Sequence, residues 1–423
     1  MTSRLSPRRY AIEVVLFLSY AAFSVTWMAL PPLASQLIAF FGVDKATYAL
    51  LGTVVTISKV VAPLLAGFLA TKIGVKNTIL GGSAFVAFAV LGPLFPTFQM
   101  FLVSRALYGI GGAVLVALVP AMVVQWFPKE ERTIVNGING VAANTGFATA
   151  MLLTPVLSSS PSMAFTVPGL GIALQQWQGT LVVFSLVSVA LFVAWAIVGR
   201  ENQVQPATTA TAAAPPANVT YFDVWKKKET WLIALSFTGP VALYLTLATW
   251  LPKHYQEQLH FTAPQAARYT SIMLFSGIPS AIIFSFAAQR VGIRRPFLII
   301  GGALSGVAAF GTFLGTSPAV LVASSVLLGV SLFIPTASLV TMLMELKGTT
   351  PRQVALMSST MISFCYTLNS IVPNLVGKSA DATGSFVPGF VVLTVASWVS
   401  VVSGFLLPET GPKAGARSEP AAS

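Results

Sequence analysis

Long apolar runs alternate with short polar segments along almost the whole chain. A run of roughly 17 to 25 mostly apolar residues can cross a hydrocarbon core of about 30 Å as a helix. Twelve runs of this length are present, with Gly, Ser and Thr scattered through them as in packed membrane helices. The predicted spans cover residues 12–36, 47–70, 78–96, 98–122, 135–158, 178–199, 230–252, 266–288, 296–314, 318–344, 353–376 and 386–407.

The segment at 200–229 interrupts this pattern between the sixth and seventh predicted spans. It is rich in Ala, Thr and Pro and ends in the amphipathic stretch YFDVWKKK. Because this composition cannot build a packed core, we interpret the segment as a linker whose end lies on the membrane surface. The sequence therefore predicts an N-terminal six-helix bundle at 1–199, a cytoplasmic linker at 200–229, a C-terminal six-helix bundle at 230–409 and a cytoplasmic tail at 410–423.

Composition and charge favour an all-α membrane protein. Of the 423 residues, 55% are hydrophobic and 9% are charged, whereas soluble domains contain about 25% charged residues. With the N-terminus inside, 18 of the 24 Lys and Arg fall in cytoplasmic segments. This positive-inside bias predicts a multi-pass inner-membrane protein with both termini in the cytoplasm. It also accounts for the net charge of +12 without a nucleic-acid partner.

No set of residues in the sequence indicates catalysis. The single cysteine, Cys365, lies inside a predicted span, so neither a disulfide framework nor a metal cluster is expected. A phosphate-binding loop ending in Lys-Ser or Lys-Thr is missing from the sequence. The sequence therefore predicts a protein that is not an enzyme and needs no cofactor.

One polar hinge occurs twice. GFLATKIGVKN at 67–77 and SFAAQRVGIRR at 285–295 lie 218 positions apart, and Pro155 and Pro373 differ by the same offset. The two halves therefore look like copies of one six-helix unit, which predicts two pseudo-symmetric bundles. Parallel repeats of this kind place a substrate site near the membrane midplane between them.

The repeated hinge carries a family resemblance. GFLATKIGVKN resembles the loop signature of the major facilitator superfamily, and RALYGIGGA in the fourth span resembles its second motif. The resemblance covers essentially the whole chain and implies alternating access of two bundles around a central cavity. It makes the hinge a gating turn, although its basic residues also fit plain positive-inside anchors. The predicted gating residues are Gly67, Thr71, Lys72, Gly74, Lys76, Gln289, Arg290, Gly292 and Arg294.

The chain departs from the family pattern at one position of this loop. The family usually carries an acid where this chain has Thr71, and the second copy has Gln289. The acid through which the family loop forms an ion pair is therefore missing from both copies.

Two basic residues fall within predicted spans, Lys59 in the second and Arg105 in the fourth. Intramembrane charges are costly and mark functional sites by default. All twelve acids fall in loops, tails or ends of the predicted spans, so water, backbone carbonyls or a bound anion must compensate these cations. We predict that both contact an anionic substrate. The alternative for Arg105 is a structural tie to neighbouring backbone carbonyls. The alternatives for Lys59 are a position on the wall of a water-filled cavity or an error in the predicted span boundary.

Polar and aromatic residues are predicted to complete the pocket, since spans one, four, seven and ten line the cavity in the family. The two histidines, His254 and His260, are expected in a solvated outer loop. The sequence therefore predicts no relay of carboxylates or histidines for a coupling proton. Whether a proton is a coupling partner is left open. The additional substrate-binding candidates are Tyr20, Trp27, Asn144, Tyr244, Tyr366 and Asn369.

The sequence as a whole predicts a monomeric secondary transporter that moves a small, anionic solute across the lipid bilayer. The loops WFPKEER, ELKGTTPRQ and LLPETGP look similar to those of family members that move cyanate, nitrate or organic anions. A drug or hydrophobic-compound exporter of the same fold is the main alternative, although such exporters typically have an intramembrane acid and a Gly-Pro motif in span five. A lipid carrier and a non-transporting membrane sensor are further alternatives.

Overall fold

The computed structural model of the chain is helical almost throughout. It describes residues 7–127, 129–169, 171–202, 220–346, 349, 351–411 and 413. Residues 203–219 of the predicted linker, and 412 and 414–423 of the predicted tail, lie outside the described residues. Contacts between Cα atoms divide the chain into two compact units.

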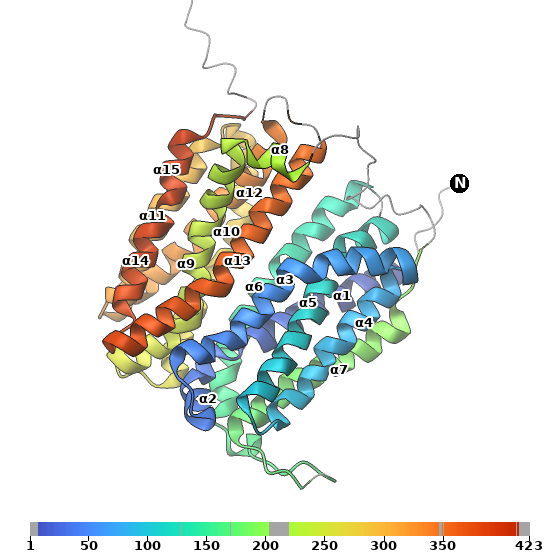
Figure 1. Ribbon diagram of the computed structural model, residues 1–423, viewed down its shortest axis with the longest axis vertical. Helices are drawn as coiled ribbons and strands as arrows, with labels where there is room; N and C mark the ends of the chain where they lie inside the picture. Colours follow the sequence, from blue (N-terminus) through green and yellow to red (C-terminus); the bar gives the residue numbers. More distant parts are fainter. Residues whose placement is uncertain are drawn as a thin grey trace, which may run out of the picture. The chain divides into compact units, whose positions relative to one another are not determined.

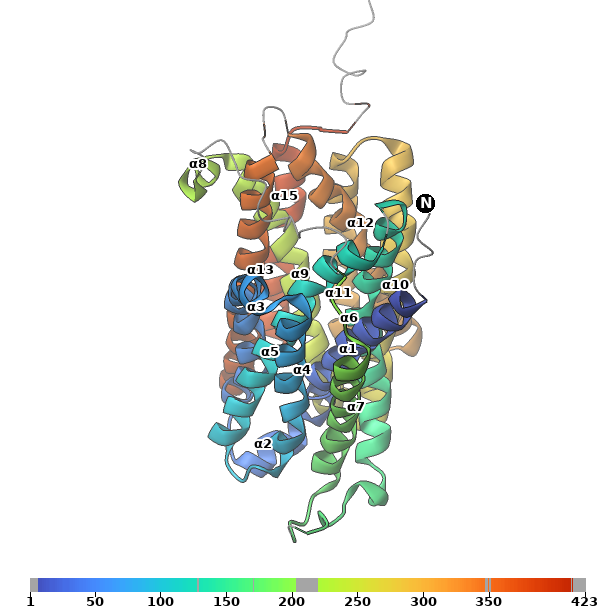
Figure 2. The ribbon, with the colours of Figure 1, turned by 90° about the vertical axis from the view of Figure 1, so that its right-hand side faces the viewer.

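The first unit comprises Met1–Thr209, with Thr262–Ser271 from the start of a later helix. In Figures 1 and 2 its helices run from dark blue to green, and α4 and α5 lie side by side, as do α1 and α7. Its helices are α1 (Arg8–Met28), η1 (Pro31–Leu33), α2 (Ala34–Phe41), α3 (Lys45–Ile73), α4 (Val75–Ala87), η2 (Phe88–Leu94), α5 (Phe98–Trp126), α6 (Lys129–Ser158), η3 (Pro161–Met163) and α7 (Gln176–Val198).

The second unit comprises Ala210–Phe261 and Ile272–Ser423. In Figure 1 its helices run from light green through yellow to red. Helices α9 and α13 pack against each other, as do α11 and α12. Its helices are α8 (Tyr221–Trp225), α9 (Lys228–Gln258), most of α10 (Ala263–Val291), α11 (Arg295–Leu314), α12 (Pro318–Glu345), α13 (Pro351–Thr383), α14 (Val387–Ser397) and α15 (Val399–Leu406).

Polar side chains begin three of the long helices. Asp44, Thr97 and Ser317 accept hydrogen bonds from the backbone N–H groups of Thr47, Met100 and Val320, at the starts of α3, α5 and α12. These N–H groups would otherwise have no partner inside their helix. Hydrogen bonding from Thr47 also lowers the pKa of Asp44.

Eleven helices of the described part are long and apolar enough to cross a membrane, one fewer than the twelve predicted spans. The missing span, 353–376, lies within α13, which is long enough at 33 residues. Ser, Thr and Asn recur along α13 and lower its hydropathy. Because α13 packs against α9, part of this polar surface meets protein rather than lipid.

Two helix ends differ from the predicted spans. Helix α1 begins at Arg8, so Glu13 lies in its second turn, where it is buried instead of ending a span. Helix α9 continues through Pro252 to Gln258, so His254 is a buried helical residue and the predicted outer-loop position is wrong. Pro252 has no N–H to donate to the Ala248 carbonyl, and Pro inside membrane helices is tolerated because neighbouring groups can bond carbonyls freed in this way.

The predicted surface stretch after the linker forms the short helix α8. Tyr221, Phe222 and Trp225 are exposed, whereas Val224 is fully buried in the core of the second unit. Trp225 Nε1 donates to Thr360 Oγ1 on α13 at 3.0 Å. Helix α8 therefore docks on its own unit through one face and leaves an aromatic face uncovered.

The GIGGA segment at 109–113 packs α5 tightly against three helices. A Cβ at Gly109 would clash with α3, one at Gly111 with the backbone of α4, and one at Gly112 with the Phe23 ring of α1. Small residues let helix backbones approach where lipid provides no hydrophobic drive. This packing places α1 and α3, which carry Trp27 and Lys59, beside the helix that carries Arg105.

Candidate functional site

The first unit brings Lys59 and Arg105 onto the same stretch of α1, and we call these two residues with Phe23, Trp27 and Tyr108 the two-cation site. Lys59 is 9% exposed, and its Nζ lies 4.0 Å from the ring centroid of Trp27 and 5.6 Å from that of Phe23. An ammonium over an aromatic face is stabilised by the ring quadrupole. Phe147 of α6 packs edge-on against Trp27, with ring centroids 5.3 Å apart, and holds the indole in place.

Arg105 lies on α5, with 3% of its surface exposed. Its Nη1 donates to Thr26 O on α1 at 3.2 Å, and its guanidinium carbon lies 4.5 Å from the Tyr108 ring centroid. Tyr108 stacks on Phe23 and donates from its hydroxyl to Phe23 O. The Nε and Nη2 groups of Arg105 have no hydrogen-bond partner among the described residues. Those two N–H groups form the edge with which arginine binds a carboxylate or oxyanion through parallel bonds.

The other predicted pocket residues of this unit lie on α1 and α6. Tyr20 is partly buried and packs against the apolar core. Asn144 is buried on α6 with 9% of its surface exposed. The buried amide of Asn144 is close in sequence to Phe147, whose ring packs against Trp27 of the two-cation site.

Three predicted pocket residues belong to the second unit. Tyr244 is buried on α9, and its hydroxyl has no hydrogen-bond partner among the described residues. On α13, Tyr366 is half-buried and Asn369 donates to Cys365 O, while Asn369 Oδ1 accepts from no described residue. The position equivalent to Lys59, Gly277, lies where a Cβ would meet the Phe333 ring at 2.5 Å. The second unit therefore fills that position with an apolar ring.

The first hinge copy is built on a glycine turn and an acid from far along the chain. Gly74 joins α3 to α4 with φ +85°, in the left-handed region. Glu201, which follows α7, accepts from the Lys76 backbone N–H at 3.1 Å. Trp195 Nε1 donates to Lys76 O at 3.2 Å, so α7 and the segment after it bond both the backbone N–H and the carbonyl of Lys76. An acid at a helix start compensates unpaired N–H groups and the positive end of the dipole.

The remaining predicted hinge residues of this copy contribute less contact. Lys72 is exposed, with its Nζ 5.7 Å from the Phe68 ring centroid. Gly67 lies inside α3 with open space where a Cβ would be. The side chain of Thr71 lies outside the described residues.

We expect Gly74→Ala to destabilise the protein, with Gly67→Ala as the matched control. A Cβ at Gly74 would collide with the Glu201 carboxylate and force a positive φ on alanine, which costs about 1–3 kcal/mol. Gly67 lies in an ordinary helix, where alanine is favoured over glycine. Thermal unfolding of both variants in detergent checks the difference. Equal melting temperatures would contradict the proposed turn geometry.

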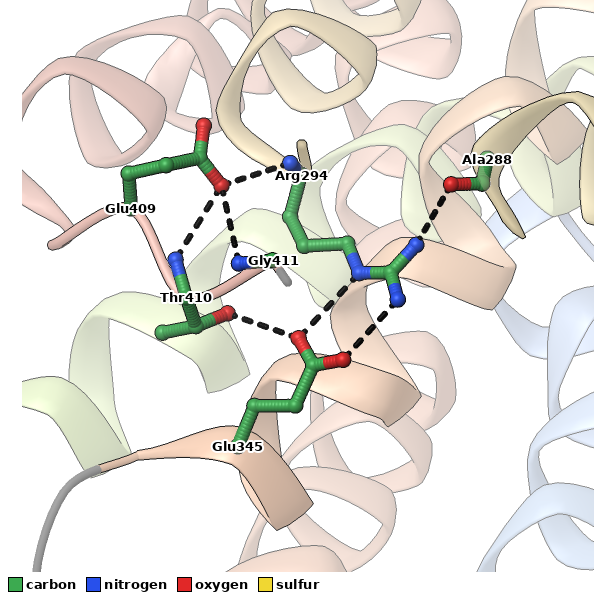
Figure 3. A network of polar contacts seen from close by, with 6 residues as sticks. All are labelled: Ala288, Arg294, Glu345, Glu409, Thr410 and Gly411. Atoms are coloured by element: carbon green, nitrogen blue, oxygen red, sulfur yellow. Dashed lines mark hydrogen bonds and ion pairs between the residues drawn. The ribbon is translucent and has the colours of Figure 1, made fainter. Parts of the chain in front are cut away.

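The second hinge copy holds a denser polar network (Figure 3). Arg294 donates from Nε and Nη2 to the two oxygens of Glu345 on α12, at 3.1 and 2.9 Å, and from Nη1 to Ala288 O. These hydrogen bonds to Glu345 raise the pKa of Arg294. Thr410 Oγ1 donates to the same carboxylate at 3.1 Å. Arg294 therefore ties the end of α10 to the end of α12.

Glu409 caps the start of α11 in this copy, as Glu201 caps α4 in the first. It accepts from the backbone N–H groups of Arg294 and Arg295 at 2.6 and 3.2 Å. Gly292 makes the turn with φ +73°. Gln289 and Arg290 are exposed at the end of α10.

Sequence reasoning missed the acids of both hinges. The hinge loops lack their own acid, but Glu201, Glu345 and Glu409 approach them from 51 to 125 positions away. One signal was available: an acid follows the last helix of each half, in GRE at 199–201 and PETG at 408–411.

Comparison with known proteins gives a family match and distant relatives. The protein-family model described as "Major Facilitator Superfamily" matches residues 13–373 of this chain. The uncharacterized protein Cj0987c of Campylobacter jejuni is 25% identical over 259 residues, which cover 60% of this chain and 74% of that protein.

Two further relatives have names that mention anions. The nitrate/nitrite transporter NrtP of Picosynechococcus sp. is 32% identical over 144 residues, or 33% of this chain and 26% of that protein. The probable anion transporter 3 of Arabidopsis thaliana is 23% identical over 262 residues, or 56% of this chain and 46% of that protein. This chain thus matches less than half the length of either.

A solved structure matches the fold over nearly the full chain. It is a bacterial homolog of the human lysosomal transporter Spinster, with a TM-score of 0.78 at 15% identity, covering 95% of this chain and 97% of that one. At this identity the likeness concerns the fold alone.

Proposed function

We propose that this chain, which belongs to the major facilitator superfamily of secondary transporters, moves a small anionic solute across the membrane by alternating access. The protein is a multi-pass membrane transporter and not an enzyme. The anionic nature of the solute is the part that rests on the site.

The unpartnered edge of Arg105 is the observation that carries this proposal. Two N–H groups of a buried guanidinium lack hydrogen bonds there. A buried donor without a partner costs about 1–3 kcal/mol, and more for a charged group. Arg294 uses the same two nitrogens to bind the Glu345 carboxylate in the second unit. A solute carboxylate or inorganic oxyanion fits the Arg105 edge in the same way, with Lys59 as a second positive charge.

Two polar groups of the second unit could form hydrogen bonds to the solute, which supports a role for Tyr244 and Asn369 in binding it. The Tyr244 hydroxyl can donate to an anion, while Asn369 keeps an oxygen that accepts from no described residue. We infer that Tyr244, Tyr366 and Asn369 contribute hydrogen bonds, while Tyr20, Trp27 and Asn144 shape the wall beside the two cations. Recognition of charge then belongs to the first unit.

The names of the two anion-related relatives favour the same solute class, although each covers a part of this chain. We further propose that the hinge residues act as gating turns. The excess of Lys and Arg in predicted cytoplasmic segments supports an inner-membrane protein with both termini in the cytoplasm. We propose a monomer.

Uptake into proteoliposomes tests the proposal, with labelled nitrate, a labelled monocarboxylate and a cationic dye as probes. We expect Lys59→Met to lower anion uptake about tenfold, because one charge-assisted hydrogen bond contributes about 1.5 kcal/mol or more. Lys45→Met removes a charge from the first residue of α3 and is the matched control. Dye transport that survives Lys59→Met, without anion uptake in the unsubstituted protein, would contradict the proposal and favour a drug exporter.

A further inference from the structure

A buried carboxyl group joins α1 to α6 away from the two-cation site. Glu13 is 9% exposed and lies in the second turn of α1. Asn139 of α6 is 6% exposed and donates from Nδ2 to Glu13 Oε1 at 2.7 Å. Helices α1 and α6 pack closely along this stretch. A carboxylate in such a place needs compensation, because burying an unpaired charge is costly.

The second oxygen of each side chain has no hydrogen-bond partner among the described residues. These atoms are Glu13 Oε2 and Asn139 Oδ1. Both are acceptors while the carboxyl group is ionised, so neither can satisfy the other. A proton on Oε2 changes this, because a protonated carboxyl group has one O–H donor. That donor can bond to Asn139 Oδ1 and complete a ring of two hydrogen bonds between acid and amide.

The charged side chains near Glu13 bond to other groups, so they do not compensate its charge in place of that proton. Arg9, one turn earlier on α1, pairs with Glu131 of α6 at 3.1 Å and lies over the rings of Tyr10 and Phe127. Arg8 donates to the carbonyls of Ile197 and Val198 at the end of α7.

Helices α5 and α7 also pack on α1, and their described residues supply no closer charge. Helix α7 contains no titratable residue, and the titratable residues of α5 are Arg105 and Tyr108 of the two-cation site. The hydrogen bond from Asn139 is therefore the one polar contact that Glu13 makes with the described residues.

We propose that Glu13 and Asn139 form a proton-binding site through which this transporter couples solute movement to protons. The ligand is a single proton from water, which adds to Glu13 Oε2 without any redox change. Coupling rests on the proposed transport function, whereas proton binding itself does not. The predicted spans show no relay of acids or histidines that could carry a coupling proton. The pair of Glu13 and Asn139 supplies a protonatable group instead.

Infrared titration of the purified protein tests proton binding without any solute. We expect a carbonyl stretching band of a protonated carboxyl group in the unsubstituted protein that is lost as pH rises. Glu13→Gln removes this band, while Glu257→Gln, in an acid that pairs with Lys253 at 3.2 Å, leaves it unchanged. Glutamine at position 13 can donate to Asn139 Oδ1 as the protonated acid does, so the variant keeps the helix contact. Identical titrations of the unsubstituted protein and Glu13→Gln would overturn the proposal.

Transport in proteoliposomes then tests coupling. We expect a pH gradient to stimulate net anion uptake in the unsubstituted protein and in Glu257→Gln. In Glu13→Gln the stimulation should be lost, while exchange of labelled for unlabelled anion at equal pH continues. Stimulation that persists in Glu13→Gln would overturn the coupling. Failure of the anion probes in every variant would count against the proposed function alone, since the infrared titration still decides proton binding.

Discussion

Arg105→Lys should lower kcat/KM for anion uptake by about 100-fold, although the positive charge is kept. Lysine cannot present two parallel N–H donors, so it loses the edge formed by Nε and Nη2. Two charge-assisted hydrogen bonds together contribute about 3 kcal/mol or more, and each 1.4 kcal/mol corresponds to about tenfold in affinity. The measurement is initial uptake of labelled nitrate and of a labelled monocarboxylate over a range of concentrations in proteoliposomes.

The alternative role of Arg105 is a tie between α5 and α1 through Thr26 O. Lysine can still donate to this carbonyl, so a purely structural arginine predicts near-normal uptake for Arg105→Lys. Arg268→Lys makes the same charge-conserving change at an exposed residue of the first unit and is the control. Near-normal uptake with Arg105→Lys would therefore contradict binding through the unpartnered edge, provided that both variants unfold at the same temperature.

The helices of this protein follow from the sequence more closely than their ends do. Apolar runs and glycine-rich packing motifs locate the helices, since lipid leaves a spanning backbone few other structures. The seventh predicted span ends at residue 252, where polar residues begin, yet α9 continues to Gln258. The start of α1 was misplaced by four residues, and this error hid Glu13 at a span end.

The residues of the candidate site also differ in how well the sequence predicts them. Lys59 and Arg105 could be selected from the sequence, because a basic residue in an apolar run stands out. The aromatic partners of these cations were harder to choose, since Trp27 and Tyr108 look like ordinary packing residues. Contacts between distant segments were not predictable at all: Glu201 and Lys76 are 125 positions apart, and only the fold brings them together.

Glu345→Gln should destabilise the second unit by about 3 kcal/mol or more, because removing one partner of a buried ion pair costs about 3–5 kcal/mol. The side chains of Arg294 and Glu345 are 6% and 22% exposed, and their two hydrogen bonds are parallel. The substitution also weakens the bond from Thr410 Oγ1. Denaturant unfolding in detergent, followed by tryptophan fluorescence, measures the change.

Glu257→Gln is the matched control, because it makes the same chemical change in a single ion pair within one helix, outside the Arg294 network. Glu257 pairs with Lys253 four residues earlier on α9, and its side chain is 31% exposed. Pairs of this kind contribute about 0.3–0.5 kcal/mol, so this variant should unfold close to the unsubstituted protein. The double variant Arg294→Gln/Glu345→Gln leaves no buried charge unpaired and should recover part of the loss. Equal losses in Glu345→Gln and Glu257→Gln would mean that the Arg294 network stabilises the hinge no more than a single ion pair within one helix does.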